Sequence, residues 1–170
     1  QFDEKIDQLQ SSSTQKKQLG KIRLAEKALR LYRNEVITRS LNSFEKMIVQ
    51  KFKYLNRKDS LIERISVNKS DFVIHVFDQN ENEINLRDLS AGERQLLAVS
   101  ILWTLSELSK TKIPVVIDTP LGRLDSKHRN QLITKYFPEA GSQTVILSTD
   151  EEIIGTYYKS FKPYVGKEYL

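Results

Sequence analysis

The first 57 residues contain no proline, and this feature restricts the fold more than any other in the chain. They are rich in Lys, Arg, Glu, Gln and Leu, and their apolar residues recur at steps of three and four: Ile22, Ala25, Leu29, Tyr32, Val36, Leu41, Phe44, Ile48, Phe52 and Leu55. That spacing lines them up along one stripe of a helix. Ser11–Thr14 interrupts this pattern with poor helix formers, which is compatible with a break, a hairpin tip or a junction between joined segments. We expect residues 1–57 to form a coiled-coil arm and then a docking helix, although a plain amphipathic helix explains 35–57 equally well.

After residue 60 the hydrophobic period changes. Segments 61–67 and 71–78 alternate like two strands around a turn at 68–70, and a polar loop follows at 79–83. A helix is expected at 91–109, and an apolar run at 113–117 ends at Asp118, as a buried parallel strand would. A helix at 126–136, a strand at 144–148 and a short helix from Asp150 complete the series. Alternating strands and helices predict an α/β domain over residues 58–170.

Composition excludes several classes of protein. Cysteine is absent, no apolar run is long enough to cross a membrane, and the first residues do not resemble a signal peptide. We therefore expect a cytoplasmic protein with no membrane partner, and the chain reads as a piece of a longer one. The net charge of +5 is compatible with DNA, but many proteins of this charge bind none. Candidate DNA contacts on the arm, which a solvated helix face explains at least as well, are Lys16, Lys17, Lys21, Arg23, Lys27, Arg30 and Arg33.

The segment 89–95 reads Leu-Ser-Ala-Gly-Glu-Arg-Gln at the start of the helix expected at 91–109. The Ser90 hydroxyl can cap that helix or face a ligand, and Gly92 lets an anion approach the backbone closely. The free N–H groups and the positive end of the helix dipole favour phosphate. A Ser-x-Gly pattern alone is more often a capped helix without a ligand.

The segment 115–125 places Asp118 at the carboxyl end of a strand, where it can hold a Mg²⁺-bound water beside a nucleotide. An aspartate that merely caps a strand-to-loop turn is the alternative. Pro120 predicts an extended conformation for Thr119. Trp103 is expected in the core. His75 and His128 lack a second ligand at metal spacing and are expected to be structural or surface residues.

In order and spacing, the two segments resemble the signature, Walker B and D-loop motifs of SMC-like ABC ATPases. Segments 89–103, 114–129, 136–140 and 145–153 are most similar to the DndD family, the ATPases of DNA sulfur (phosphorothioate) modification systems. The resemblance covers residues 60–158. It implies the C-terminal lobe of an ABC/SMC-type ATPase head, with an N-terminal coiled coil or long helical arm.

The resemblance also implies cofactors, partners and residue roles. Ser90, Ala91 and Gly92 would contact the γ-phosphate of ATP held by a second subunit, and Glu93 would join them or remain a first-turn surface residue. Asp118 would serve Mg²⁺ through water, and Asp125 would be the D-loop aspartate. The implied partners are an N-terminal P-loop lobe of the same protein, a second head that forms a homodimer on ATP binding, DNA, and other sulfur-modification proteins.

The chain departs from the family pattern at three places. Thr119 stands where relatives carry a catalytic glutamate, and a threonine can orient water but not act as a base. Thr149 stands where relatives carry a switch histidine. Asp150 and Glu151 are candidates for the missing carboxylate, although acidic residues at a helix start explain them better. No Gly-x-x-x-x-Gly-Lys-Ser/Thr motif occurs, so the chain alone should bind ATP poorly.

The sequence therefore predicts an ATP-dependent clamp and Mg²⁺-dependent ATPase that acts in DNA sulfur modification, with slow hydrolysis. One alternative is a hydrolysis-poor scaffold that tethers modification proteins to DNA. The other is an SMC-like DNA repair ATPase outside this system.

Overall fold

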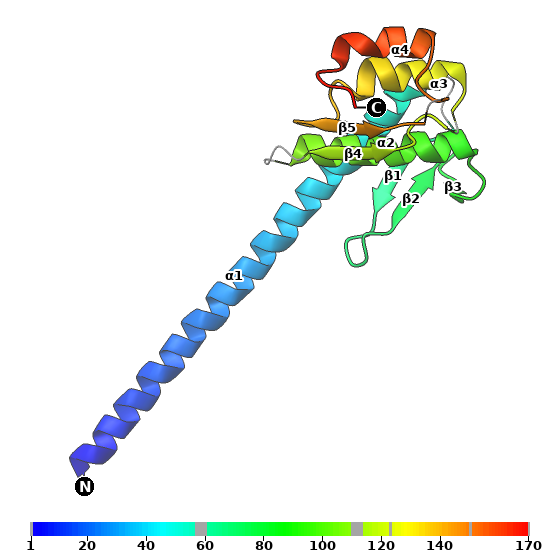
Figure 1. Ribbon diagram of the computed structural model, residues 1–170. Helices are drawn as coiled ribbons and strands as arrows, with labels where there is room; N and C mark the ends of the chain where they lie inside the picture. Colours follow the sequence, from blue (N-terminus) through cyan, green and yellow to red (C-terminus); the bar gives the residue numbers. More distant parts are fainter. Residues whose placement is uncertain (1, 57–60, 110–113, 123, 150, 170) are drawn as a thin grey trace. The chain divides into compact units, whose positions relative to one another are not determined.

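The computed structural model describes residues 2–56, 61–109, 114–122, 124–149 and 151–169, and side chains from Lys16 onward (Figure 1). The chain divides into two compact units, residues 1–41 and 42–170, each described here by itself. This division falls inside the first helix, whereas the sequence-based boundary at residue 57 follows the end of the helical pattern. Two residues of the candidate motifs, Arg123 and Asp150, lie outside the described residues.

The N-terminal unit is helical throughout its described length and belongs to α1 (Phe2–Leu55). The break or hairpin predicted at Ser11–Thr14 is wrong, because α1 runs through these residues without interruption. Serine and threonine lower helix propensity by only some tenths of a kcal/mol each, roughly, and they keep the backbone N–H that proline lacks.

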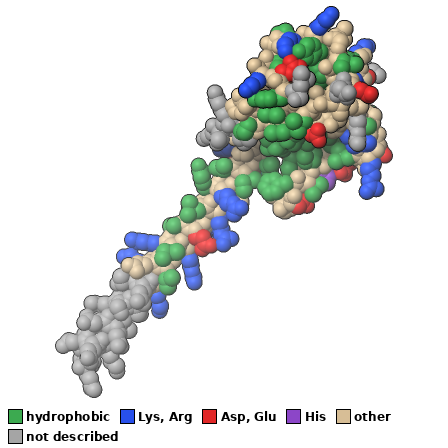
Figure 2. Space-filling model, in the orientation of Figure 1, with side chains coloured by type: hydrophobic (Ala, Val, Ile, Leu, Met, Phe, Trp, Pro, Cys, Tyr) green, Lys and Arg blue, Asp and Glu red, His purple; other side chains and the backbone are tan. Residues whose placement is uncertain are grey.

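Residues 16–36 of α1 expose an apolar stripe that no described residue covers. Ile22 is 62% exposed, Leu29 68% and Tyr32 70%. On the other faces, Glu26 pairs with Arg30 at 2.7 Å and Glu35 with Arg39 at 2.8 Å, each one helical turn apart. Figure 2 shows apolar and basic side chains alternating along this helix. Exposed pairs of this kind contribute only about 0.3–0.5 kcal/mol each, so they support the helix without specifying a partner.

The core of the second unit begins with the last turns of α1. Ile48, Phe52 and Leu55 are fully buried there. The helix α2 (Ala91–Leu108) contributes Leu96 and Trp103 to the same core, as expected for Trp103. Aromatic rings continue it in a chain of contacts with centroids 5.5–6.2 Å apart, formed by Tyr54, Trp103, Tyr136, Phe137 and Phe161. The predicted α2 is confirmed to within one residue.

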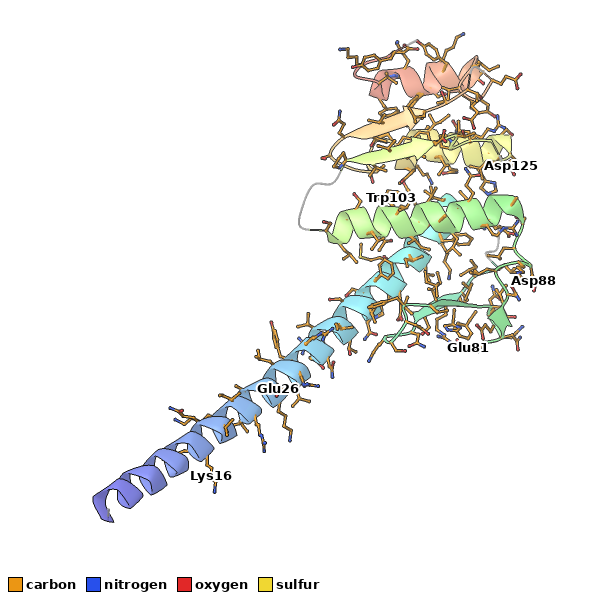
Figure 3. All side chains as sticks on the ribbon, turned by 60° about the horizontal axis from the view of Figure 1, so that its bottom comes forward. Lys16, Glu26, Glu81, Asp88, Trp103 and Asp125 are labelled. Atoms are coloured by element: carbon orange, nitrogen blue, oxygen red, sulfur yellow. The ribbon has the colours of Figure 1, made fainter. Side chains whose placement is uncertain are left out.

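An antiparallel sheet lies on one side of α2, in the order β1 (Arg64–Val67), β2 (Ile74–Phe77), β3 (Glu83–Ile84) (Figures 1 and 3). The hairpin of β1 and β2 was predicted, and its register pairs Ile65 with Val76. The short β3 was not, because its two residues sit in a polar run with no alternating pattern. His75 Nδ1 lies 2.6 Å from Glu83 Oε1, which ties β2 to β3 and gives this histidine a structural role.

Two parallel strands, β4 (Val115–Asp118) and β5 (Thr144–Leu147), lie on the other side of α2 (Figures 1 and 3). The parallel pairing agrees with the sequence pattern, but the strands are not buried on both faces. Val116 is 65% exposed, Val145 39% and Leu147 52%. In the register, Val116 pairs with Val145 and Asp118 with Leu147, so these four side chains share one face of the pair.

The last layer packs beyond β4 and β5 (Figure 1). It comprises α3 (Ser126–Gln131), the π-helical turn η1 (Leu132–Tyr136), α4 (Thr156–Phe161) and the 3-10 turn η2 (Lys162–Tyr164). The helix predicted at 126–136 is present with a π register in its second half. The helix predicted from Asp150 is wrong: residues 151–153 form turns, and α4 begins only after Gly155, whose φ of +58° starts it in a new direction.

Candidate functional site

The start of α2 is fixed by reciprocal hydrogen bonds. Ser90 Oγ accepts the backbone N–H of Glu93 at 3.2 Å, and Glu93 Oε2 accepts the backbone N–H of Ser90 at 2.9 Å. This is a capping box, and it follows from a serine and a glutamate three residues apart at a helix start. The Glu93 carboxylate is engaged with its own helix cap, so its predicted contact with a nucleotide stays a prediction.

Three donors remain at this helix start. The Ser90 hydroxyl accepts one bond and keeps its proton for donation. The N–H groups of Ala91 and Gly92 belong to the first turn, where no preceding carbonyl is available to accept them. Ser90 and Ala91 are exposed and Gly92 is partly exposed. An 18-residue helix adds its positive dipole end at this point, so the arrangement suits a phosphate group.

Arg94 holds the turn that precedes α2. Its Nη1 donates to the carbonyl oxygens of Leu89 and Arg87, the second at 3.3 Å. The side chain therefore fixes the approach of the chain to Ser90, a role that sequence reasoning did not assign to it.

Asp118 ends β4 with an exposed carboxylate. Its Oδ1 accepts the hydroxyl of Thr119 at 3.0 Å. Thr119 has a φ of +48°, so the extended conformation predicted for it is wrong. Its N–H donates to Leu147 O at 2.8 Å and continues the parallel ladder by one bond, which holds the residue while the chain turns. A β-branched residue with positive φ is strained by about 1–3 kcal/mol, and such strain gathers at functional sites.

One cleft brings the two predicted motif segments together. It has a volume of about 610 Å³ and is lined by Ala91, Arg94, Gln95, Asp118, Thr119 and Gly122. The helix start and the strand end are thus neighbours in this fold, and both open to solvent.

Asp125 caps the N-terminus of α3. Its Oδ1 accepts the backbone N–H of His128 at 2.9 Å and lies 2.9 Å from His128 Nδ1. These contacts, led by the backbone N–H, hold the pKa of the Asp125 carboxyl below its usual value. The side chain is 62% exposed, so it is available to a neighbouring molecule while it caps the helix.

The structure points to a different acidic residue after β5 than the sequence did. Glu151 and Thr149 are exposed, and Asp150 lies outside the described residues. Glu152, which sequence reasoning passed over, is only 5% exposed, and its Oε1 accepts the backbone N–H of Leu121 at 3.1 Å. In the sequence, Glu152 cannot be told apart from the adjacent Glu151. Its position just before Ile153 and Ile154 is the one feature that suggests burial.

The donor set suits Mg²⁺ only in part. Within the described residues, His, Asp and Glu side chains form no group of three that could hold a metal ion. Among the residues that the structure describes, Asp118 is the one carboxylate lining the cleft. Mg²⁺ is commonly held by one or two carboxylates, with waters and phosphate oxygens as its other ligands, so Asp118 fits a water-mediated contact. Among the described helices, none has the length and apolar character needed to cross a membrane.

Comparison of the sequence with known families and with curated proteins gives no significant match. Among solved structures, an SMC head bound to the C-winged helix domain of ScpA is similar, with a TM-score of 0.56 and 14% identity over 71% of this chain. A structure concerned with ATP-driven dimerization and DNA-stimulated activation of SMC ATPases gives 0.51 at 15% identity, covering 79% of each chain. An SMC head with an extended coiled coil, bound to the C-terminal domain of ScpA from Pyrococcus furiosus, gives 0.53 at 13% identity over 75% of this chain.

At these identities the similarity establishes the fold. The chain has the α/β architecture of the C-terminal lobe of an SMC head with a long N-terminal helix. It spans 38% of the first of these structures and 31% of the third.

Proposed function

We propose that this chain is the C-terminal lobe of an SMC-like ATPase head that closes on a second head around ATP and Mg²⁺. The observation that carries the proposal is the exposed start of α2, where the Ser90 hydroxyl and the N–H groups of Ala91 and Gly92 are consecutive donors in the cap and first turn. A triphosphate brought by another protein surface supplies the oxygens that such donors need.

The exposed face of β4 and β5 supports the proposal that another lobe of the same protein covers these strands. Val116, Val145 and Leu147 form an apolar surface that continues to Asp118 at the strand end. A lobe that covers this surface would lie directly beside Asp118. In the proposed protein, that lobe carries the P-loop that this chain lacks.

Each residue of the site has one task in the proposed mechanism. Bound Mg²⁺ supplies charge neutralisation of the phosphate oxygens. Asp118 would hold the ion through water, and the Thr119 hydroxyl, which donates to Asp118 Oδ1, would orient a nearby water. Ser90, Ala91 and Gly92 donate to phosphate oxygens across the interface, and the exposed Asp125 reaches the opposite head. Binding energy realised only in the closed state then shifts the population toward it.

The test compares Ser90→Arg with Ser142→Arg in the complete protein. Ser142 is also exposed, but it lies before the N-terminal end of β5, away from the strand end that carries Asp118. An arginine at position 90 fills the space where the phosphate would lie. We expect it to abolish ATP-dependent dimerisation in analytical ultracentrifugation, while Ser142→Arg dimerises like the wild type. Full dimerisation of Ser90→Arg would refute the proposal.

The biological setting that we propose is DNA sulfur modification. It rests on the resemblance of segments 89–103, 114–129, 136–140 and 145–153 to the DndD family. In this setting, the partners are DNA and the other modification proteins in the cytoplasm. Deletion of the gene from its natural host should remove phosphorothioate linkages from genomic DNA, as measured by mass spectrometry of nucleoside dimers. Unchanged linkages would place the protein in another SMC-like process such as DNA repair.

A second candidate function is a scaffold that binds ATP with little or no turnover and tethers modification proteins to DNA. Two observations favour it. Asp118 is followed by Thr119, and the Glu152 carboxylate accepts the N–H of Leu121. Among the described residues, no carboxylate other than Asp118 lines the cleft. Steady-state phosphate release separates the two candidates. Release that disappears in Asp118→Asn supports the ATPase, and its absence from the wild type supports the scaffold.

A further inference from the structure

The peptide unit between Pro120 and Leu121 is held from both sides by polar side chains, of which Glu152 is buried and Gln95 partly buried. Gln95 Nε2, from the second turn of α2, donates to the carbonyl of Pro120. Glu152 Oε1, from the turn after β5, accepts the N–H of Leu121 at 3.1 Å. The same peptide plane therefore contacts α2 through Gln95 and the turn after β5 through Glu152, two residues that lie 57 positions apart in the sequence.

Both side chains are only half satisfied. Glu152 is 5% exposed, and its Oε2 is buried without a hydrogen-bond partner in the described part of the chain. Gln95 is partly buried, and its Oε1 is in the same situation. A buried polar atom without a partner costs about 1–3 kcal/mol, and an apolar side chain at either position would avoid that cost. The two residues therefore do something for the fold that a well-packed leucine would not.

The Pro120–Leu121 peptide belongs to the loop that follows β4 and contains the candidate site residues Thr119 and Asp125. Thr119 N–H is bound to Leu147 O on one side of the peptide, and Leu124 O accepts Arg129 Nε at 2.9 Å on the other. Gly122 fits closely against the same carboxylate: a Cβ there would lie 3.2 Å from Glu152 Oε1 and 3.4 Å from Thr119 Cγ2. The described residues of this loop, 119–122 and Leu124, are thus positioned by contacts from α2, α3, β5 and the turn after β5.

We propose that Gln95 and Glu152 are positioning residues that clamp the Pro120–Leu121 peptide, and that this clamp couples the start of α2 to the arrangement of Thr119 and Asp125. The functional half of this inference rests on the proposed ATPase. A movement of α2 reaches the loop through the Gln95 amide, and a movement of the turn after β5 reaches it through the Glu152 carboxylate. Glu152 acts through the loop and takes no proton from water.

The test uses the complete protein and two readouts. The first is hydrogen exchange of the Leu121 amide without nucleotide, which measures the clamp alone. The second is steady-state ATP hydrolysis, separated into kcat and KM. The variants are Glu152→Gln, which keeps an acceptor for Leu121 N–H, and Glu152→Leu, which removes it. Glu139→Gln and Glu139→Leu are the matched controls, because Glu139 is exposed in the turn after η1.

Glu152→Leu should speed Leu121 exchange by about tenfold or more, as expected when a buried amide loses its acceptor. It should lower kcat by about tenfold or more while KM for ATP changes by less than about twofold, because binding remains and positioning is lost. Glu152→Gln should stay within about threefold of the wild type in both readouts, and the Glu139 variants should match the wild type.

Gln95→Leu tests the other side of the peptide. It should loosen the same amide, and the double variant with Glu152→Leu should exchange less than the sum of the two effects predicts, since both act on one peptide. An additive pair would show two independent contacts and overturn the clamp.

Three further results overturn the proposal. They are unchanged Leu121 exchange in Glu152→Leu, unchanged kcat in Glu152→Leu, and a Glu152→Gln variant as impaired as Glu152→Leu, which would assign the role to charge. Circular dichroism of each variant shows whether it is folded. A wild-type protein that releases no phosphate would refute the ATPase, and the exchange readout alone would then decide whether the clamp exists.

Discussion

At the residue scale, the site depends on short polar contacts that the sequence predicts only where they are local. The Ser90–Glu93 cap and the Asp125 cap each join residues three apart, and a serine or aspartate before a helix is a readable signal. The contact of Glu152 with Leu121 spans 31 residues. It depends on how the turn after β5 packs, which no spacing rule describes. The sequence therefore suggested Asp150 and the exposed Glu151 as candidates, and not Glu152.

Gly122→Ala should disturb the site more than the loss of a glycine normally does. The added Cβ would meet Glu152 Oε1 at 3.2 Å, and that oxygen is held by Leu121 N–H and cannot easily retreat. In the proposed ATPase, we expect kcat for ATP hydrolysis to fall by about tenfold, because small displacements of groups that position the reactants are costly. Gly166→Ala is the control, since a Cβ there meets nothing within 4 Å. Equal turnover in the two variants would contradict the close fit at Gly122.

Asp125 should titrate below the ordinary aspartate value of 3.8, mainly because the His128 backbone N–H favours its ionised form. A lowered pKa contributes stability that is present above pH 3.8 and is lost as pH falls through the folded-state value. NMR titration of the Asp125 carboxyl carbon measures this directly. A midpoint at or above 3.8 would show that the cap does not form in solution.

At the element scale, segments with a clear periodic or apolar pattern were predictable, whereas β3 and the segment after β5 were not. The periodicity of α2 predicted it to within a residue, and the parallel pairing of β4 and β5 follows from an apolar run before a helix and another after it. In contrast, β3 has two residues, and the helix expected from Asp150 begins at Thr156. In that segment, residues 151–153 form turns, and Glu152 is buried and bonded to Leu121 N–H, a contact distant in sequence that the local pattern does not indicate.

Tyr136, in η1, offers a test of the aromatic core. It is 1% exposed, and its hydroxyl is buried without a hydrogen-bond partner among the described residues. Tyr136→Phe should leave the free energy of unfolding unchanged or raise it by about 1 kcal/mol, since no bond is lost and a desolvated hydroxyl is removed. Chemical denaturation measures the change. A loss of more than about 2 kcal/mol would show that the hydroxyl is bonded in solution.

The same residue predicts a dependence on alkaline pH. Burial raises the pKa of Tyr136 to about 12, so its contribution to stability is complete below the ordinary value of 10 and is lost as pH rises through about 12. Tyr136→Phe should therefore be less sensitive to pH between 10 and 12 than the wild type. Tyr164→Phe is the matched control, because Tyr164 is 52% exposed. Identical pH profiles for the two variants would contradict the buried position of Tyr136.

At the scale of the whole molecule, the sequence predicted the α/β class and the C-terminal lobe of an SMC-type head, and the similarity to solved SMC heads supports both. It did not predict that one face of β4 and β5 would be exposed. An apolar run of the kind seen in β4 looks the same whether its cover lies in this chain or elsewhere. The structure shows that no described residue covers this face of β4 and β5.

Val116→Glu tests the missing cover in the complete protein. If a second lobe packs on β4, a charge at this position is buried without a partner and should destabilise the head by about 3 kcal/mol or more. Val73→Glu is the control, because Val73 is also apolar and is 48% exposed beside β2. Equal thermal stability of both variants would show that β4 remains in solvent.

The apolar stripe on the first unit has a geometric consequence of its own. Ile22, Leu29 and Val36 repeat at intervals of seven residues, whereas a straight α-helix completes two turns in slightly more. The stripe therefore drifts around the helix axis by about 20° per heptad, or about 40° from Ile22 to Val36. A second helix that packs along this stripe must therefore supercoil around α1 with a left-handed twist. In such a coiled coil, a change in the distance between its two ends also rotates one end relative to the other.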